Sequence, residues 1–128
     1  MKKTASPPTI LLVEDDVWLA ELETRVLTKE GEYTVVHVPH APAAMVAIDT
    51  VHPDVIILDV LLGGNTAFAL LHELQSYDDT GRLPIILCTN MAETLHLSEL
   101  ESYGVRRIVD KTTMKPDDLV AAVRSVLL

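Results

Sequence analysis

Carboxylate side chains end two of the apolar runs in this sequence. Residues 55 to 58 are all apolar and lead into Asp59, and residues 9 to 13 lead into Glu14 and Asp15. Apolar runs of this length are typical of strands that are covered on both faces, as in a parallel sheet. Ligands of such open sheets bind just outside the carboxyl ends of the strands. We therefore expect these three carboxylates at one edge of a sheet.

Three converging carboxylates require a counter-charge. Each pair would repel by about 4 kcal/mol at a separation of about 4 Å and an effective dielectric constant of about 20. Oxygen ligands without histidine or cysteine suit Mg²⁺, or alternatively Mn²⁺. Magnesium characteristically binds one or two carboxylates and takes up phosphate oxygens. The acids thus predict a metal site that receives a phosphoryl group.

Two further polar residues follow predicted strands at the same edge. Thr89 ends the apolar run at 84–89, and Lys111 follows the run at 106–110. A threonine hydroxyl can donate one hydrogen bond to a phosphoryl oxygen, and a lysine ammonium adds a compact positive charge. Together with a carboxylate nucleophile and a metal, these groups supply what phosphoryl transfer to Asp59 needs.

Five strands alternating with five helices must position these groups. We predict strands at residues 9–14, 33–38, 54–59, 84–89 and 106–110, and helices at about 16–30, 41–51, 66–77, 92–103 and 116 to the end. This alternation indicates an α/β fold with a parallel sheet and helices on both faces. Asp16, Thr66 and Asp117 are predicted to start helices, and Gly31 to end one. One domain is expected at 9–128, after a flexible tail at 1–8.

Composition narrows the class of protein. The chain has 128 residues, 48% of them hydrophobic, and a formal net charge of -9. This charge repels phosphate backbones and argues against direct nucleic-acid binding. A single cysteine, Cys88, permits no internal disulfide, and the first residues lack the apolar core of a signal peptide, so we expect a cytoplasmic protein. No apolar stretch reaches the roughly 20 residues that span a bilayer, so no membrane partner is expected.

Four segments, in order and in register, resemble the receiver domains of bacterial two-component response regulators. They are residues 10–16 (ILLVEDD), 53–60 (PDVIILDV), 83–89 (LPIILCT) and 104–111 (GVRRIVDK). The resemblance implies a flavodoxin-like, doubly wound sheet of five parallel strands in the order 2-1-3-4-5, with five helices.

The resemblance also implies a role for each residue of the site. Asp59 would accept a phosphoryl group from a histidine kinase or a histidine phosphotransfer protein. Glu14, Asp15, Asp59 and the backbone carbonyl of Leu61 would hold Mg²⁺, and Thr89 and Lys111 would contact the phosphoryl group. Such a domain is a switch rather than an enzyme. Its altered surface, at the fourth helix and fifth strand, would act on a separate protein partner.

Several residues depart from the family pattern. Gly63 and Gly64 replace the usual turn after the phosphoacceptor, Thr112 stands where proline usually follows the lysine, and Ile108 replaces the usual aromatic switch residue. Leu61 and Met91 occupy positions that help to orient the hydrolytic water, and neither binds water well. We therefore predict slow self-dephosphorylation.

Other interpretations of the same residues remain open. The chain could be a phosphorylation-independent interaction module, or the receiver piece of a larger regulator or hybrid kinase. An aspartyl phosphotransferase or phosphatase ranks lowest, because Leu61 stands where many such enzymes place a second acid. Lys111 could belong to a solvated basic edge with Arg106 and Arg107. Trp18 is expected to pack rather than to take part in chemistry.

Overall fold

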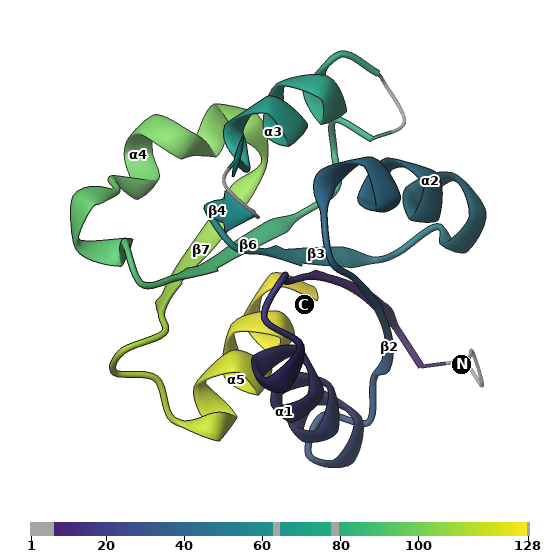
Figure 1. Cartoon of the computed structure of the whole chain (residues 1–128), viewed down its shortest axis with the longest axis vertical. Coiled ribbons are helices and arrows are strands. Elements are labelled where there is room, and N and C mark those ends of the chain that lie inside the picture. Colours follow the sequence, from purple (N-terminus) through teal and green to yellow (C-terminus); the bar gives the residue numbers. More distant parts are fainter. Residues whose placement is uncertain (1–6, 63–64, 78–79, 128) are drawn as a thin grey trace.

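A five-stranded parallel sheet forms the centre of the protein in a computed structural model, which describes residues 7–62, 65–77 and 80–127 (Figure 1). The strands lie in the order β2-β1-β3-β6-β7. Their bounds are β1 Thr9–Val13, β2 Thr34–Val38, β3 Val55–Leu58, β6 Ile85–Thr89 and β7 Val105–Asp110. Counting only these five strands along the chain, the order is 2-1-3-4-5, so the predicted flavodoxin-like fold is confirmed.

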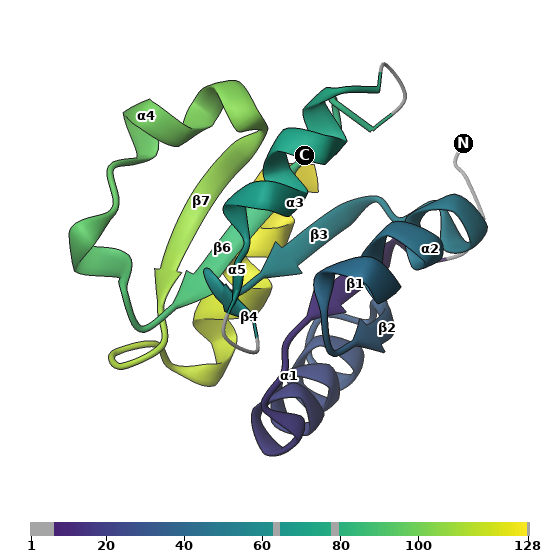
Figure 2. The same ribbon diagram turned by 45° about the horizontal axis from the view of Figure 1, so that its top comes forward.

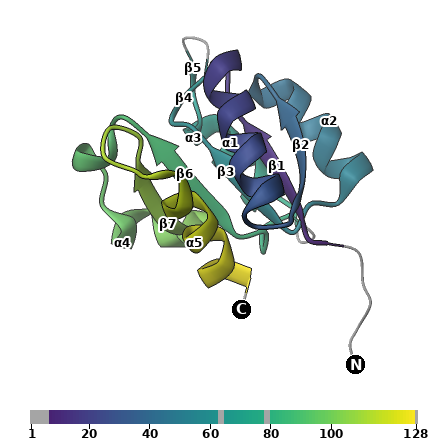
Figure 3. The same ribbon diagram turned by 90° about the horizontal axis from the view of Figure 1, so that it is seen from below.

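Helices cover both faces of the sheet. The longer helices are α1 Val17–Lys29, α2 Ala41–Val51, α3 Phe68–Gln75 and α5 Pro116–Leu127, and α4 is the single turn Leu97–Leu100. Helices α1 and α5 pack on one face, and α2, α3 and α4 on the other, as Figure 1 and the view from below in Figure 3 show. In the described part of the chain, no helix has the length and apolar character needed to cross a membrane.

Alternate residues of each central strand belong to two separate hydrophobic cores, one on each face of the sheet. In β1, Leu11 packs with the α2 and α3 side, whereas Ile10 and Leu12 pack with the α1 and α5 side. Successive side chains of a strand point to opposite faces, so a strand that is covered twice must be apolar throughout. This explains why the strands appear in the sequence as uninterrupted apolar runs.

Helix α1 begins where the sequence predicts. The Asp16 side chain accepts a hydrogen bond from the Leu19 backbone N–H, which makes it the N-cap. The helix ends at Lys29, just before Gly31. A Cβ atom at Gly31 would lie 2.5 Å from the Tyr33 ring, so the close approach of that ring requires glycine here. The packing role expected for Trp18 is wrong, because 84% of this residue is exposed on α1.

The segment after β3 differs from the prediction. A short antiparallel hairpin, β4 Leu61–Leu62 with β5 Asn65–Thr66, precedes the helix and takes in Thr66, the first residue of the helix predicted at 66–77. Helix α3 therefore begins at Phe68, and Ala67 precedes it without a side-chain cap. Thr66 lies in β5 and does not cap the helix. The glycines at 63 and 64 and residues 1–6 of the expected tail lie outside the described residues.

The helix predicted at 92–103 is broken into three pieces. A 3-10 turn, η1 Ala92–Thr94, is followed by α4 and by a second 3-10 turn, η2 Glu101–Tyr103. Leu95 has an extended backbone between the first two pieces, and the Thr94 hydroxyl donates to the Met91 carbonyl. Such local side-chain bonds compete with helix formation. Only Leu100 of this segment is buried, so little packing opposes the break.

The register of the sheet aligns the strand ends that carry the candidate site. Val13 pairs with Leu58, so Glu14 and Asp59 follow paired positions of β1 and β3. Thr89 at the end of β6 pairs with Asp110 of β7, which Lys111 follows. Figure 2 shows the arrowheads of β3, β6 and β7 at the same edge of the sheet. The crossover connections therefore bring together the polar residues at the carboxyl ends of these strands.

Candidate functional site

Lys111 connects the acids of two different strands. Its Nζ donates to Asp59 Oδ2 at 2.7 Å and to Glu14 Oε1 at 2.5 Å. The exposed side-chain fractions are 7% for Lys111, 3% for Glu14 and 13% for Asp59. Neighbouring Arg106 and Arg107 are exposed. Lys111 is thus a buried counter-ion of the acids and does not belong to a solvated basic edge.

Burial and charge pairing shift the pKa of Lys111 in opposite directions. Burial alone would lower the pKa of the Lys111 ammonium, but the hydrogen bonds to Asp59 and Glu14 and their charges outweigh it, so the pKa is raised. The pKa of Glu14 is also raised, because burial exceeds the opposing effect of the Lys111 hydrogen bond. At neutral pH the lysine therefore stays charged beside the acids.

The three predicted acidic ligands lie close enough to share one cation. Glu14, Asp15 and Asp59 each offer a carboxylate oxygen, and these oxygens lie within 4.8 Å of one another. Two oxygens bound to the same Mg²⁺ at about 2.1 Å are at most about 4.2 Å apart. The cluster exceeds that limit by at most about 0.6 Å, which small side-chain rotations can close. Three carboxylates and one ammonium carry an excess of two negative charges, so the donor set fits a divalent cation.

The acids differ in how exposed they are to solvent. Glu14 is buried, and its second oxygen, Oε2, accepts a hydrogen bond from the Asp16 backbone N–H at 3.1 Å. Asp15 is exposed. A cation that approaches from solvent therefore meets Asp15 more directly than it meets Glu14.

Thr89 closes the β6 end of the site. It is buried, and its Oγ1 accepts a hydrogen bond from the Met91 backbone N–H at 3.1 Å. The hydroxyl hydrogen is not used by that bond. Met91 itself is 37% exposed in the loop that follows.

The positions that depart from the family pattern have distinct surroundings. Ile108 is partly buried and packs against the core on the α2 and α3 side. Thr112 is exposed, and its N–H and hydroxyl both donate to Asp110 Oδ1. The described residues contain no cis peptide bond. Leu61 lies in β4, and the proposed contact of its carbonyl with a metal stays a prediction.

One buried acid near the site was missed by the sequence analysis. Glu23 of α1 is 3% exposed, and its Oε2 accepts a hydrogen bond from the Cys88 thiol at 3.5 Å. Among the described residues, its Oε1 is the one buried side-chain oxygen or nitrogen without a hydrogen-bond partner. Burial raises the pKa of Glu23 to about 7, and the negative charge of Glu14 adds to the effect. The signal was present, since Ala20, Glu23 and Leu27 share one helical face.

The sequence of the chain matches a known family model. The model of the response regulator receiver domain matches residues 10–124, which is most of the chain.

Curated relatives extend this match. The DNA-binding response regulator MtrA of Mycobacterium tuberculosis is 34% identical over 118 residues, covering 92% of this chain and 50% of that protein. The transcriptional regulatory protein YvrH of Bacillus subtilis is 27% identical over 119 residues, covering 93% of this chain and 48% of that protein. The chain thus spans about half the length of these relatives.

Solved structures of similar architecture agree with this match. The BeF3-activated N-terminal receiver domain of RstA from Klebsiella pneumoniae has a TM-score of 0.78 and 31% identity, covering 93% of this chain and 97% of that one. The signal receiver domain of a histidine kinase from Syntrophus aciditrophicus has a TM-score of 0.79 and 28% identity, covering 94% and 89%.

Proposed function

Because the chain belongs to the response regulator receiver domain family, we propose that it is a phosphorylation-dependent switch that accepts a phosphoryl group on Asp59. The phosphodonor is a histidine kinase or a histidine phosphotransfer protein. The observation that carries the proposal is the ion-paired cluster, in which Lys111 contacts Asp59 while Glu14 and Asp15 lie within reach of the same cation.

Each side chain has a defined task in this mechanism. An Asp59 carboxylate oxygen forms a bond to phosphorus while the phosphorus–nitrogen bond of the donor's phosphohistidine breaks, and the imidazole leaves with the donor protein. The Lys111 ammonium, already hydrogen-bonded to Asp59, stabilises the charge on the phosphoryl oxygens. The Thr89 hydroxyl keeps its hydrogen to donate to one of these oxygens. Glu14, Asp15 and Asp59 would hold Mg²⁺, or alternatively Mn²⁺, which would neutralise the negative charge that otherwise repels the incoming phosphate.

The phosphoryl group would then change the surface that a protein partner recognises. Moving a population from 1:99 to 99:1 takes about 5.5 kcal/mol of differential stabilisation, which the new contacts to Thr89 and Lys111 would supply. We assign the changed surface to α4 and β7, the fourth α-helix and the fifth strand of the main sheet. The domain is a switch and not an enzyme, acts in the cytoplasm, and binds neither nucleic acid nor membrane directly. The net charge of -9 supports the absence of direct nucleic-acid binding, because it repels phosphate backbones.

Intact mass measurement after incubation with Mg²⁺ and acetyl phosphate tests the proposal. The wild type is expected to gain one phosphoryl group, and Asp59→Asn to gain none. Asp117→Asn is a matched control, because Asp117 is an exposed aspartate at the start of α5. An unmodified wild type, or an adduct that persists in Asp59→Asn, would overturn the assignment.

A second candidate is an interaction module that does not depend on phosphorylation. It is favoured by one observation, the aliphatic Ile108 packed against the core at the position of the usual aromatic switch. The same measurement separates the two candidates, because the module would remain unmodified.

A further inference from the structure

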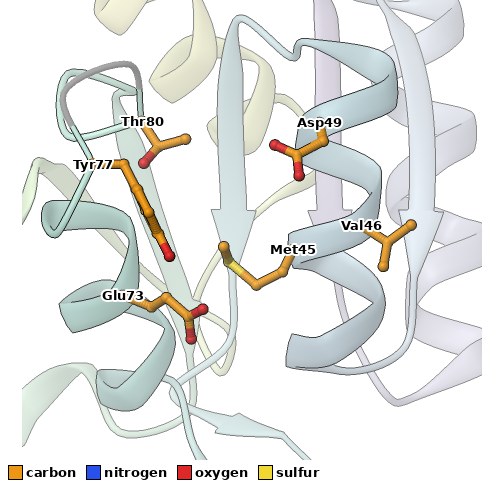
Figure 4. Close-up of a pocket in the computed structure, with 6 residues that line it drawn as sticks. All are labelled: Met45, Val46, Asp49, Glu73, Tyr77 and Thr80. Atoms are coloured by element: carbon orange, nitrogen blue, oxygen red, sulfur yellow. The ribbon is translucent and has the colours of Figure 1, made fainter.

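A hollow of about 390 Å³ lies between α2 and α3, on the face of the sheet opposite α1 and α5. Met45 and Asp49 extend into it from α2, and Glu73 and Tyr77 from α3 and its end (Figure 4). None of these residues belongs to the phosphoacceptor site. The hollow is near the lower end of the range of about 300–1,000 Å³ for ligand pockets, so it suits one or two side chains.

The charges around this hollow are not balanced. Asp49 and Glu73 come from different helices and face the same space (Figure 4), and among the residues that the structure describes no basic side chain lines it. Within the described residues, the ion pairs involve other acids, namely Glu21, Glu14 and Asp59. Neither Asp49 nor Glu73 is among these acids, so both carboxylates can accept hydrogen bonds from a cation that enters the hollow.

The walls of the hollow favour a cation that also has a flat apolar surface. The Tyr77 ring lies along one wall and the Met45 thioether lies opposite, as Figure 4 shows. Aromatic faces attract cations, more often arginine than lysine. Val46 and Tyr77, at the rim, are two of the six exposed large hydrophobic residues in the described part of the chain. The rim can thus cover the apolar stem of a long basic side chain.

We propose that this hollow binds an arginine side chain carried by a segment of a partner protein. A guanidinium is planar and has five donors, so it can stack on Tyr77 while donating to Asp49 and Glu73. Lysine has a compact and strongly hydrated ammonium, so it stacks less well on the ring and cannot as readily donate to two separate carboxylates. The proposal goes beyond the switch function and does not require phosphorylation of Asp59.

Amide chemical-shift titration of the full chain with the peptide acetyl-Gly-Arg-Gly-amide tests the proposal. Saturable shifts are expected in α2 and α3. The double variant Asp49→Asn/Glu73→Gln should weaken binding about fivefold or more, since exposed ion pairs contribute modestly. Tyr77→Ala should weaken it as well. The citrulline peptide, which has the same shape and no charge, should not bind.

Matched variants separate this site from general attraction to an acidic protein. Glu30→Gln/Glu32→Gln removes the same charge from exposed positions elsewhere and should change the affinity less than about twofold. Asp59→Asn should bind the peptide as the wild type does, even though it cannot be phosphorylated. Equal binding by Asp49→Asn/Glu73→Gln, equal binding of citrulline, or shifts confined to the Glu14 and Asp59 region would overturn the proposal.

Discussion

The thiol of Cys88 on β6 donates to the carboxylate of Glu23 on α1 across 3.5 Å, inside the core between the sheet and the two helices α1 and α5. In the part of the chain that the structure describes, no cation forms an ion pair with Glu23. The same carboxylate raises the pKa of Cys88 further above the level set by burial. Cys88 is therefore a poor nucleophile at neutral pH.

Glu23 should make the stability of the protein depend on pH near neutrality. Its folded-state pKa is raised from 4.5 to about 7, so the stability contributed by the protonated form is complete below about pH 4.5 and is lost as the pH rises through 7. The loss is at most about 3 kcal/mol, from 2.5 pKa units at about 1.36 kcal/mol each. Glu23→Gln should be more stable than the wild type at about pH 8 but not at about pH 4.

Denaturant unfolding across this pH range measures the difference. Glu30→Gln, which changes an exposed acid at the end of the same helix, should follow the wild type. A constant gap between Glu23→Gln and the wild type at every pH would contradict the assignment.

Replacement of Lys111 should destabilise the protein through the acids that it leaves behind. Lys111→Met keeps the stem but removes the ammonium from two largely buried carboxylates, Glu14 and Asp59. Breaking a buried ion pair costs about 3–5 kcal/mol, and we expect a loss near the lower end without Mg²⁺. Added Mg²⁺ should restore more stability to this variant than to the wild type. Lys115→Met is the exposed control, and an equal loss there would contradict the argument.

Magnesium affinity should depend more on Asp15 than on Glu14. Asp15 is exposed, whereas Glu14 is buried, so a cation from solvent reaches Asp15 more directly. Calorimetric titration should show a loss of more than about tenfold for Asp15→Asn and a smaller loss for Glu14→Gln. Asp16→Asn is the matched control, because asparagine caps a helix about as well as aspartate. A larger loss of Mg²⁺ affinity for Glu14→Gln than for Asp15→Asn would contradict this prediction.

Slow loss of phosphate should depend on Met91. This side chain is partly exposed beside Thr89 and cannot hold a hydrolytic water. Replacement with asparagine should shorten the lifetime of the Asp59 phosphoryl group several-fold, and Met91→Leu should leave it unchanged. Decay can be followed by intact mass after the donor is removed. Loss of phosphate within seconds in the wild type would contradict the prediction.

The convergence of the site could be predicted because it depends on topology. Glu14, Asp59 and Lys111 each follow an apolar strand, and parallel strands joined by right-handed crossovers place their carboxyl ends on one side. The alternation of strands and helices was therefore sufficient to bring together residues 97 positions apart.

Features that depend on the path of the chain in three dimensions could not be predicted from the sequence. The hairpin at Thr66 depends on the path of the chain after β3, and the exposure of Trp18 depends on the direction in which α1 leaves the site. Glu23 is a different case, because the helical period did indicate that this position is buried, but the polar residue type favoured solvent. Patterns of neighbouring residues in the sequence do not show how a segment is placed in the folded protein.

The fragmented helix around α4 lowers the cost of reshaping the surface that we assign to the partner. A regular helix of this length would lose a full ladder of backbone hydrogen bonds on opening, whereas this segment has two 3-10 turns, an extended Leu95 and one buried anchor, Leu100. Regions with few buried apolar contacts open at low free energy. A partner that changes the conformation of this segment would thus lose little of its binding free energy to opening it.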